Sequence, residues 1–326
     1  MSSCIIIGAG LAGLTAACEL TRHQWQVTLL DKGRGVGGRM ATRRIHNTRA
    51  DHGAQYFSAR TPEFQAQVQA MQEAGVVKEW YLPGIDHHPR YVGSSGMSAV
   101  PKYMAQELDI RTGEKVVHVA GDTTGCTVRT EAGTIYSAEK LIITIPAPQV
   151  KVLLADSSIQ LLAPDQLALD SIAYQPCLAV IAELNQPSRI PAPGGIRYEE
   201  GPISWIADNQ QKGIINDSTT VTIHASPQYS REHLEGDLNK VGEKLIAELH
   251  EWIPAEAVES FQVHRWRYSL CDQRHPEPYL RCDTPFSMLL GGDGFGMGNV
   301  EGAYQSGLQM ARYLVGEGKR KKLSME

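Results

Sequence analysis

The feature that most constrains this chain is a Gly-x-Gly-x-x-Gly motif at residues 8–13. An apolar run at residues 4–7, short enough for a buried parallel strand, precedes the motif, and a helix-forming run at residues 14–20 follows it. This order predicts a strand, a tight turn and a helix in direct succession. Such a unit is expected to form part of a parallel α/β sheet.

Each glycine of the motif meets a different physical demand. Gly8 lets the chain turn sharply, Gly10 leaves room for a pyrophosphate beside the backbone, and Gly13 lets the helix pack against the strand. The unpaired amides at the start of the helix, at Leu11, Ala12 and Gly13, favour the negative charge of phosphates. The motif therefore predicts a dinucleotide site.

A second strand is predicted at residues 26–30, and it ends in Asp31, 18 residues after Gly13. A carboxylate about 20 residues beyond the motif can accept hydrogen bonds from both ribose hydroxyls of an adenosine. A glycine-rich turn without a ligand is the alternative for residues 8–13 taken alone. Because strand, helix, second strand and acid follow in register, we interpret the whole unit as a nucleotide site.

Composition and charge exclude several other classes of function. The chain has 326 residues, 42% of them hydrophobic, which is enough for a large core in one large or two medium domains. A formal net charge of -5 indicates neither nucleic-acid nor membrane-surface binding, and no run approaches the ~20 apolar residues of a membrane span. The six cysteines form no C-x-x-C pair, so no metal site is indicated and a cytoplasmic protein is expected.

A glycine-rich segment with three arginines follows Asp31 directly and contains Gly38-Arg39-Met40. Gly-Gly-Arg immediately behind the ribose acid resembles the FAD proteins of the glutathione-reductase-like family more than plain NAD dehydrogenases. The resemblance implies that Arg39 lies against the pyrophosphate. An exposed basic loop is the alternative.

The segment Asp51-His52-Gly53-Ala54-Gln55-Tyr56-Phe57 says little from its residues alone, since it is a polar turn and a glycine followed by an aromatic pair. After Gly-Gly-Arg-Met, however, it resembles renalases and their bacterial relatives, in the flavin amine oxidase superfamily. The resemblance implies that Gly53 to Tyr56 pass along the flavin ring, which makes Gln55 and Tyr56 candidate catalytic residues.

The end of the chain carries a second glycine-rich motif. A predicted strand at residues 288–291 stops at Gly292-Asp293, a loop with Phe295 follows, and a helix is expected from about Asn299 to about Leu314. The resemblance implies that this helix start faces the pyrimidine end of the flavin, and that the aspartate meets the ribityl or phosphate region. The motif supports FAD, held without a covalent bond, as the cofactor.

Between these motifs, three strand-like runs at residues 115–119, 126–130 and 134–136 and a closing strand at 141–145 indicate a β-meander. The resemblance implies that the backbone of Val117 binds the adenine. The predicted fold class is therefore α/β, with an FAD-binding Rossmann-like domain and β-meander plus a second, mixed-sheet substrate domain. The expected domain limits are 1–75, 91–149 and 265–326 for the FAD domain and 76–90 and 150–264 for the substrate domain.

The substrate domain offers two further candidate catalytic residues, His224 at the end of an apolar strand and Trp266 at the return to the FAD domain. A histidine at a strand end is often a satisfied structural residue, and that alternative stays open. One helix is expected from about His233 to Trp252. The residues expected to bind the cofactor are Gly8, Gly10, Leu11, Ala12, Gly13, Asp31, Lys32, Gly38, Arg39, Met40, Gly53, Ala54, Gln55, Tyr56, Val117, Gly292, Asp293, Phe295, Asn299 and Val300.

The resemblance implies an FAD oxidase that oxidises off-pathway dihydro isomers of NAD(P)H to NAD(P)+ and reduces O2 to hydrogen peroxide. Loss of hydride leaves an aromatic pyridinium, so the site needs no base. Flavin monoamine oxidases share the fingerprints but place a lysine before the C-terminal motif, and this chain has none between Lys244 and Lys319. Another FAD oxidoreductase, such as an amine oxidase or a desaturase-like enzyme, and a non-catalytic flavoprotein remain alternatives.

Overall fold

The computed structural model describes residues 2–82, 88–283 and 286–323, and by packing it divides into two compact units. The first unit comprises the chain up to residue 38, residues 101–173, and the chain from residue 271 on; the second comprises residues 39–100 and 174–270. The division falls inside two long strands, β12 (Ala173–Leu184) and β16 (Val258–Gln273).

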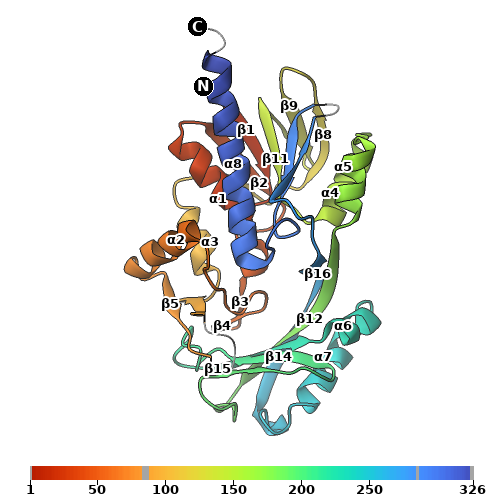
Figure 1. The fold of residues 1–326 in the computed structure, drawn as a ribbon. Coiled ribbons are helices and arrows are strands. Elements are labelled where there is room, and N and C mark those ends of the chain that lie inside the picture. The colour runs from red at the N-terminus through yellow and green to blue at the C-terminus, as the bar shows by residue number, and fades with distance from the viewer. Residues whose placement is uncertain (1, 83–87, 284–285, 324–326) are drawn as a thin grey trace. The chain divides into compact units, whose positions relative to one another are not determined.

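A six-stranded sheet with the order β17-β18-β11-β1-β2-β7 forms the centre of the first unit (Figure 1). Five strands are parallel, and β17 pairs antiparallel at one edge. Residues 4–7 of β1 are all buried, as expected for a central parallel strand covered on both faces. The strands are β1 (Ser3–Ile7), β2 (Gln26–Asp31), β7 (Asp109–Thr112), β11 (Lys140–Ile143), β17 (Tyr279–Cys282) and β18 (Met288–Gly291).

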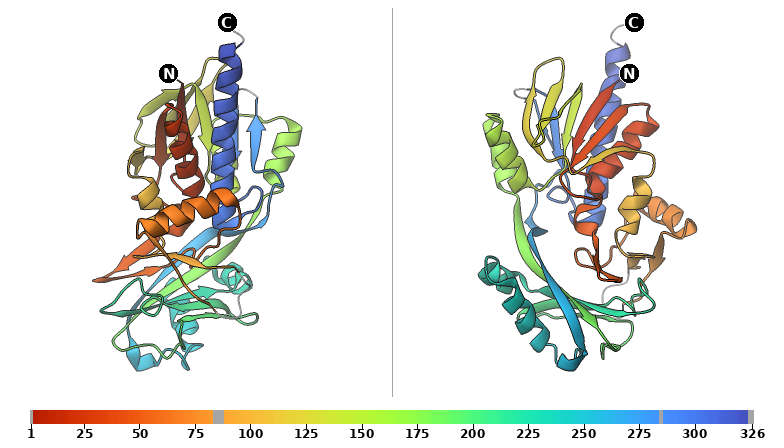
Figure 2. Two further views of the ribbon diagram at one scale, coloured as in Figure 1. Left: turned by 60° about the vertical axis from the view of Figure 1, so that its left-hand side comes forward. Right: turned by 180° about the vertical axis from the view of Figure 1, so that it is seen from behind.

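Two helices pack together beside this sheet, α1 (Leu11–Arg22) and α8 (Asn299–Leu323), as Figures 1 and 2 show. A Cβ at Gly307 of α8 would lie 2.1 Å from the Ala12 carbonyl oxygen, so the two helices approach as closely as backbone allows. The antiparallel meander consists of β8 (Val116–Gly121), β9 (Cys126–Thr130) and β10 (Ile135–Ala138), and the helices α4 (Ala147–Asp156) and α5 (Ala163–Asp170) follow.

The second unit is organised on a five-stranded sheet with the order β13-β14-β15-β12-β16. The strands not yet named are β13 (Gly195–Arg197), β14 (Ile203–Asp208) and β15 (Thr219–Ala225). The β3 (Thr42–Ile45) and β4 (Thr48–Asp51) strands form a hairpin, and β5 (Val77–Glu79) pairs with β6 (Tyr91–Gly93). The helices are α2 (Pro62–Glu73), α3 (Ala99–Met104), which continues into the first unit, α6 (Pro227–His233) and α7 (Leu238–Ala247), and single turns lie at Gly38–Met40 and Ala255–Ala257.

The two faces of the five-stranded sheet have different partners. Val180, Ile206 and Ile223 share one face, and they join a core cluster with Val241 and Leu245 of α7. Residues one position along each strand point to the opposite face, because side chains alternate in a strand. That opposite face carries the site side chains described below.

The predicted fold class is confirmed, but several element limits were wrong. The helix expected from about His233 to Trp252 is shorter: α6 already ends at His233, and within the range only α7 (Leu238–Ala247) forms, its start capped by Asp237, which accepts hydrogen bonds from the amides of Asn239 and Lys240. The final helix continues to Leu323 rather than ending near Leu314.

The predicted domain limits differ from the packing units, since residues 39–75, 91–100 and 265–270 pack in the second unit and residues 150–173 in the first. The domain limits describe which part binds cofactor or substrate, so they stay a prediction.

No helix in the described part of the chain is long and apolar enough to cross a membrane.

Candidate active site

The nucleotide turn has the geometry that its glycines predict. Gly8 adopts φ +109°, a left-handed conformation that glycine tolerates and other residues disfavour. A Cβ at Gly13 would lie 2.0 Å from the Gly8 carbonyl oxygen, so only glycine allows the first turn of α1 to pack on the turn. Thr144 supports the same turn, since its hydroxyl lies 3.0 Å from the Gly8 carbonyl oxygen.

The same region fits the diphosphate and ribose of FAD. Gly10 precedes α1 with φ -76° and no side-chain cap, and a Cβ on it would meet nothing within 4 Å, so the space beside this glycine is open. The carboxylate of Asp31 is held by the amides of Ala9 at 2.7 Å and Gly33 at 2.6 Å. Each oxygen accepts one of these bonds and keeps capacity for a ribose hydroxyl.

The second glycine-rich loop, residues 291–298, is shaped by left-handed backbone. Gly292 adopts φ +128° and donates its amide to the Ser306 hydroxyl at 2.8 Å, which ties the end of β18 to α8. Phe295 is 3% exposed and packs against the ring of His275. Asp293 is half-buried and Val300 is half-buried, whereas Asn299 is exposed at the start of α8.

Val117 lies at an irregularity in the pairing of β8 with β9. Val116 pairs with Thr130 and His118 pairs with Arg129, so the ladder skips Val117. A residue at a bulge leaves the regular ladder, which frees backbone groups for other partners. This geometry is compatible with the predicted adenine contact, which stays a prediction.

In the second unit, β15 presents a row of side-chain donors to the backbone of the β4 strand and the segment after it. Thr220 donates to the Arg49 carbonyl at 2.9 Å and Thr222 to the Asp51 carbonyl at 2.8 Å. These donors are two residues apart and therefore share one face of the sheet. His224 continues the row at the next such position.

His224 and Trp266 meet at one backbone oxygen, the carbonyl of His52. The Nε2 of His224 lies 3.2 Å from this oxygen and the Nε1 of Trp266 donates to it at 2.8 Å. A carbonyl only accepts hydrogen bonds, so the Nε2 of His224 carries the proton. The rings of His52, His264 and Trp266 pack together, with centroids 4.3 to 5.0 Å apart.

The next two predicted residues are also held by contacts within this unit. Gln55 donates through Nε2 to the carbonyls of Asp51 at 2.7 Å and Gly53 at 3.1 Å, and this pair of acceptors defines the orientation of its amide. The Tyr56 ring packs against the rings of Trp80 and Trp205, with centroid separations of 6.4 and 5.6 Å. Both residues of the segment therefore have restricted rotamers.

Arg39 lies where the chain passes between the units. Its Nη1 donates to the carbonyls of Tyr268 and Ser269 at 3.3 Å each, and its guanidinium lies 5.6 Å from the centroid of the Tyr174 ring. The predicted pyrophosphate contact of Arg39 stays a prediction. A Cβ at Gly53 would lie 2.0 Å from the Arg39 carbonyl oxygen, which also accepts the amide of Ala54 at 2.9 Å.

The titratable rings around His52 are all shifted toward the neutral form. Burial lowers the pKa of His52 to about 3, and the neighbouring His264 adds to this shift. Burial likewise lowers the pKa of His224 to about 4, and it lowers the pKa of His264. These histidines are neutral at pH 7, so the segment from Asp51 to Tyr56 is not flanked by imidazolium charge.

Three residues near this segment were missed by the sequence reasoning as site residues. Asp51 and Lys212 form an ion pair whose side chains are both fully buried, with Nζ and Oδ2 2.7 Å apart. Asn209, also buried, donates to the Thr222 hydroxyl at 3.0 Å and so supports the donor row. Asp51 stood in a recognised motif, but nothing near Lys212 in the sequence indicates burial.

The predicted site residues are thus divided between the two units. Those of the second unit are Arg39, Met40, Gly53, Ala54, Gln55, Tyr56, His224 and Trp266. Those of the first unit are Gly8, Gly10, Leu11, Ala12, Gly13, Asp31, Lys32, Gly38, Val117, Gly292, Asp293, Phe295, Asn299 and Val300. Lys32 is exposed and donates to Gln149 at 3.1 Å, and Met40 is buried.

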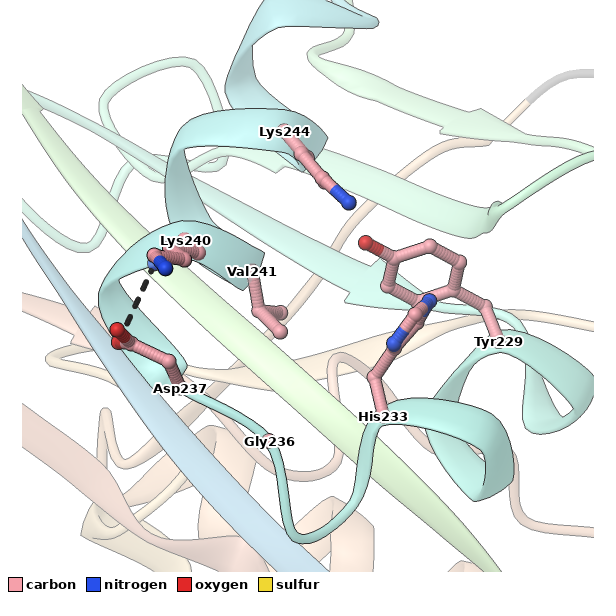
Figure 3. A pocket seen from close by; sticks show the side chains of 7 residues that line it. All are labelled: Tyr229, His233, Gly236, Asp237, Lys240, Val241 and Lys244. Carbon is pink, nitrogen blue, oxygen red and sulfur yellow. Dashed lines mark hydrogen bonds between the residues drawn. The ribbon is translucent and has the colours of Figure 1, made fainter.

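Two other features contribute nothing to this site. A small pocket between α6 and α7 is lined by Tyr229, His233, Gly236, Asp237, Lys240, Val241 and Lys244, and Figure 3 shows that it contains none of the predicted site residues. The Tyr229 and His233 rings contact each other there in a tilted arrangement, with centroids 4.2 Å apart and an interplanar angle of 56°. Within the described residues, no group of three or more His, Cys, Asp or Glu side chains could hold a metal ion.

Fold and site together define a class: an FAD-dependent oxidoreductase with a Rossmann-like nucleotide domain. The comparisons with known proteins agree. Residues 6–72 match an NAD(P)-binding Rossmann-like domain, and residues 79–315 match the flavin-containing amine oxidoreductases. The chain belongs to the flavin-containing amine oxidoreductase family, and within that superfamily it is renalase-like.

Individual relatives cover almost the whole chain. Renalase of Mus musculus is 27% identical, over 96% of this chain and 99% of the relative. A solved structure of putrescine oxidase with bound putrescine has a TM-score of 0.73 at 16% identity, covering 97% of this chain and 99% of that one. A structure provisionally assigned as a protoporphyrinogen oxidase from Exiguobacterium has a TM-score of 0.75 at 13% identity, with the same coverage. The solved structures support the fold.

We expect acid precipitation to release all of the FAD from the purified protein. Five of the six cysteines are buried and Cys18 is half-buried, and burial raises the pKa of Cys282 to about 12, so this last cysteine stays a protonated thiol. The measurement is the flavin absorbance of the supernatant against that of the pellet after trichloroacetic acid treatment. Yellow colour that remains in the washed pellet would show a covalent bond and contradict the prediction.

Proposed function

We propose that this protein is a renalase-like FAD oxidase that acts on off-pathway dihydro isomers of NAD(P)H. Isomer, O2 and one proton give NAD(P)+ and hydrogen peroxide, so the substrate loses a hydride and oxygen gains two electrons and two protons. Bound FAD supplies the chemistry of a hydride acceptor at N5 and of electron delivery to oxygen. The similarity to renalase along almost the full chain supports this choice of substrate class.

One observation carries the proposal: the N–H groups of two candidate catalytic residues, His224 and Trp266, are bonded to the backbone. His224 and Trp266 both direct their N–H groups to the His52 carbonyl, at 3.2 and 2.8 Å. The protonated nitrogen of His224 is therefore engaged, and its lowered pKa of about 4 keeps the ring neutral. A site organised in this way suits a reaction in which loss of hydride alone completes an aromatic ring.

The residues of the chain then have to hold the cofactor and orient the substrate. The open turn at Gly10 and the uncapped start of α1 would bind the diphosphate, and Asp31 would bind the ribose. In the second unit, hydrogen bonds to Asp51 and His52 fix the backbone that leads to Gly53, which the resemblance places along the flavin ring. Holding the reacting carbon at about 3–3.5 Å from its acceptor and excluding water supply the rate.

The test is an anaerobic stopped-flow measurement on the yellow holoenzyme. We expect chemically isomerised NADH to bleach the visible flavin band at least about a hundredfold faster than fresh NADH, because only the isomers present the correct ring carbon. Failure of the isomers to bleach the flavin would remove this substrate class. Variants of His224 give an internal check: loss of flavin reduction with unchanged substrate binding would show that this residue performs chemistry rather than positioning.

An amine oxidase is the second candidate, because the family match covers residues 79–315. The absence of a lysine between Lys244 and Lys319 argues against the usual amine oxidase arrangement. Bleaching by amines such as putrescine, with no response to the isomers, would favour this alternative in the same instrument.

A further inference from the structure

The second unit contains a buried ion pair whose desolvation costs free energy and which has no role in the proposed chemistry. Asp51 and Lys212 have no side-chain exposure, and their charged atoms are 2.7 Å apart. Removing two charges from water costs several kcal/mol for each ion, and mutual attraction offsets this only with good geometry and additional hydrogen bonds. The neighbours of the pair therefore indicate what it holds in place.

Asp51 anchors the segment Gly53–Tyr56, which follows it after His52 and is expected to pass along the flavin ring; we call these four residues the flavin segment. Its Oδ1 accepts hydrogen bonds from the Thr42 hydroxyl at 2.6 Å and the Met97 amide at 2.8 Å. Its backbone carbonyl accepts from Gln55 at 2.7 Å and Thr222 at 2.8 Å. Side chain and main chain of this one residue thus connect the β3–β4 hairpin, the five-stranded sheet and the segment that follows.

Lys212 connects the same anchor to the aromatic residues around Tyr56. Its Nζ lies 5.3 Å from the centroid of the Trp80 ring, and that ring packs edge-on against Tyr56. The ammonium of Lys212 therefore contacts two residues that adjoin the flavin segment: Asp51, which precedes it, and Trp80, which packs against Tyr56 at its end. Burial lowers the pKa of Lys212, and the carboxylate of Asp51 opposes that shift.

We propose that Lys212 is a positioning residue: its salt bridge with Asp51 sets the register of the Gly53–Tyr56 segment against the flavin without touching the reacting atoms. The proposal rests on the proposed function, which places this segment along the flavin ring. Lys212 pairs directly with Asp51, just before this segment, and contacts Tyr56 at its end only through the Trp80 ring, and the two contacts together restrain the segment more than either would alone.

The experiment compares Lys212→Met, Asp51→Asn and the double variant with the parent protein. Asn retains an oxygen for the bonds from Thr42 and Met97, and Met keeps the length of the lysine stem, so the double variant removes the charges and little else. The control is Lys78→Met, because Lys78 is only partly buried and donates to the Gly213 carbonyl at 2.6 Å, beside Lys212 but without contact to Asp51.

Each single variant leaves one buried charge without its partner, so we expect a lower melting temperature and weaker FAD binding. In the double variant the melting temperature recovers, because a neutral pair has no uncompensated charge. Its FAD affinity stays at least about tenfold weaker, its flavin absorption band stays shifted, and flavin reduction at saturating substrate is about tenfold slower with little change in substrate Kd. Lys78→Met resembles the parent in all five quantities.

A double variant with the parent's melting temperature, FAD affinity and absorption band would overturn the proposal, since the pair would then serve the fold alone. If the single variants do not fold, the double variant alone decides the question. FAD affinity and the absorption band are measured without substrate, so this outcome is independent of whether the parent oxidises dihydropyridine isomers.

Discussion

Substitution of Gly10 by alanine should leave the fold intact and weaken FAD binding by about a hundredfold. Gly10 has an ordinary φ of -76°, and a Cβ there meets nothing within 4 Å, so the protein itself accommodates the methyl group. The methyl would occupy the space through which the diphosphate approaches the amides of α1. Titration of apoprotein with FAD, followed by quenching of flavin fluorescence, measures the change.

Gly13→Ala provides the contrast, because its Cβ would lie 2.0 Å from the Gly8 carbonyl oxygen. Backbone cannot yield to this overlap as a flexible side chain can, so the free energy of unfolding of the apoprotein should fall by about 3 kcal/mol or more. Gly35→Ala is the control, since a Cβ at Gly35 meets nothing within 4 Å in an ordinary conformation. Parent-like FAD affinity in Gly10→Ala would contradict the assignment of this turn to the diphosphate.

The nucleotide half was predictable because its information is local. One short stretch contains the first strand, the motif at residues 8–13 and Asp31. The turn, the helix start and the ribose-binding acid are therefore all specified by residues that lie close together in the sequence. The helix start at Leu11 and the strand end at Asp31 follow that pattern closely. Local spacing could not show where α8 ends, because Gly316, Gly318 and the basic run after them offer no apolar period, yet the helix continues to Leu323.

The second half of the site depends on contacts between distant segments. Lys212 pairs with Asp51 across 161 positions of sequence, and His224 reaches the His52 carbonyl across 172. Nothing in the composition around Lys212 distinguishes it from a surface lysine. His224 was recognisable as a polar residue at the end of an apolar strand, but its partner is a backbone oxygen, which no residue pattern encodes.

The late start of the helix expected at residues 233–252, at Leu238 rather than His233, has a local cause that is visible in the sequence. Gly236 ends one turn and Asp237 is a favoured N-cap residue, so the pair signals a new helix start. Apolar periodicity on both sides of the break concealed this signal, because α7 and the turns after it present their apolar residues to the same sheet face. Capping chemistry therefore outweighs periodicity at this boundary.

Lowering the pH from 7 to 5 should destabilise the apoprotein by roughly 2 kcal/mol for each of His52 and His224. Their folded-state pKa values are about 3 and about 4, below the ordinary value near 6.5 that the unfolded chain retains. The unfolded chain therefore binds protons that the folded chain excludes. The stability from these two rings is fully present above about pH 6.5 and is lost as the pH falls toward their folded-state values. Urea unfolding at half-unit pH intervals measures the slope.

His224→Gln isolates one ring, because glutamine can still donate a nitrogen-bound hydrogen to the His52 carbonyl but does not titrate. The slope of unfolding free energy against pH between 7 and 5 should decrease by up to about 1.4 kcal/mol per pH unit, the value for one proton. An unchanged slope in His224→Gln would mean that His224 accepts a proton in the folded protein. Its bond to the His52 carbonyl would then not require a neutral ring, and acid–base chemistry at this residue would have to be reconsidered.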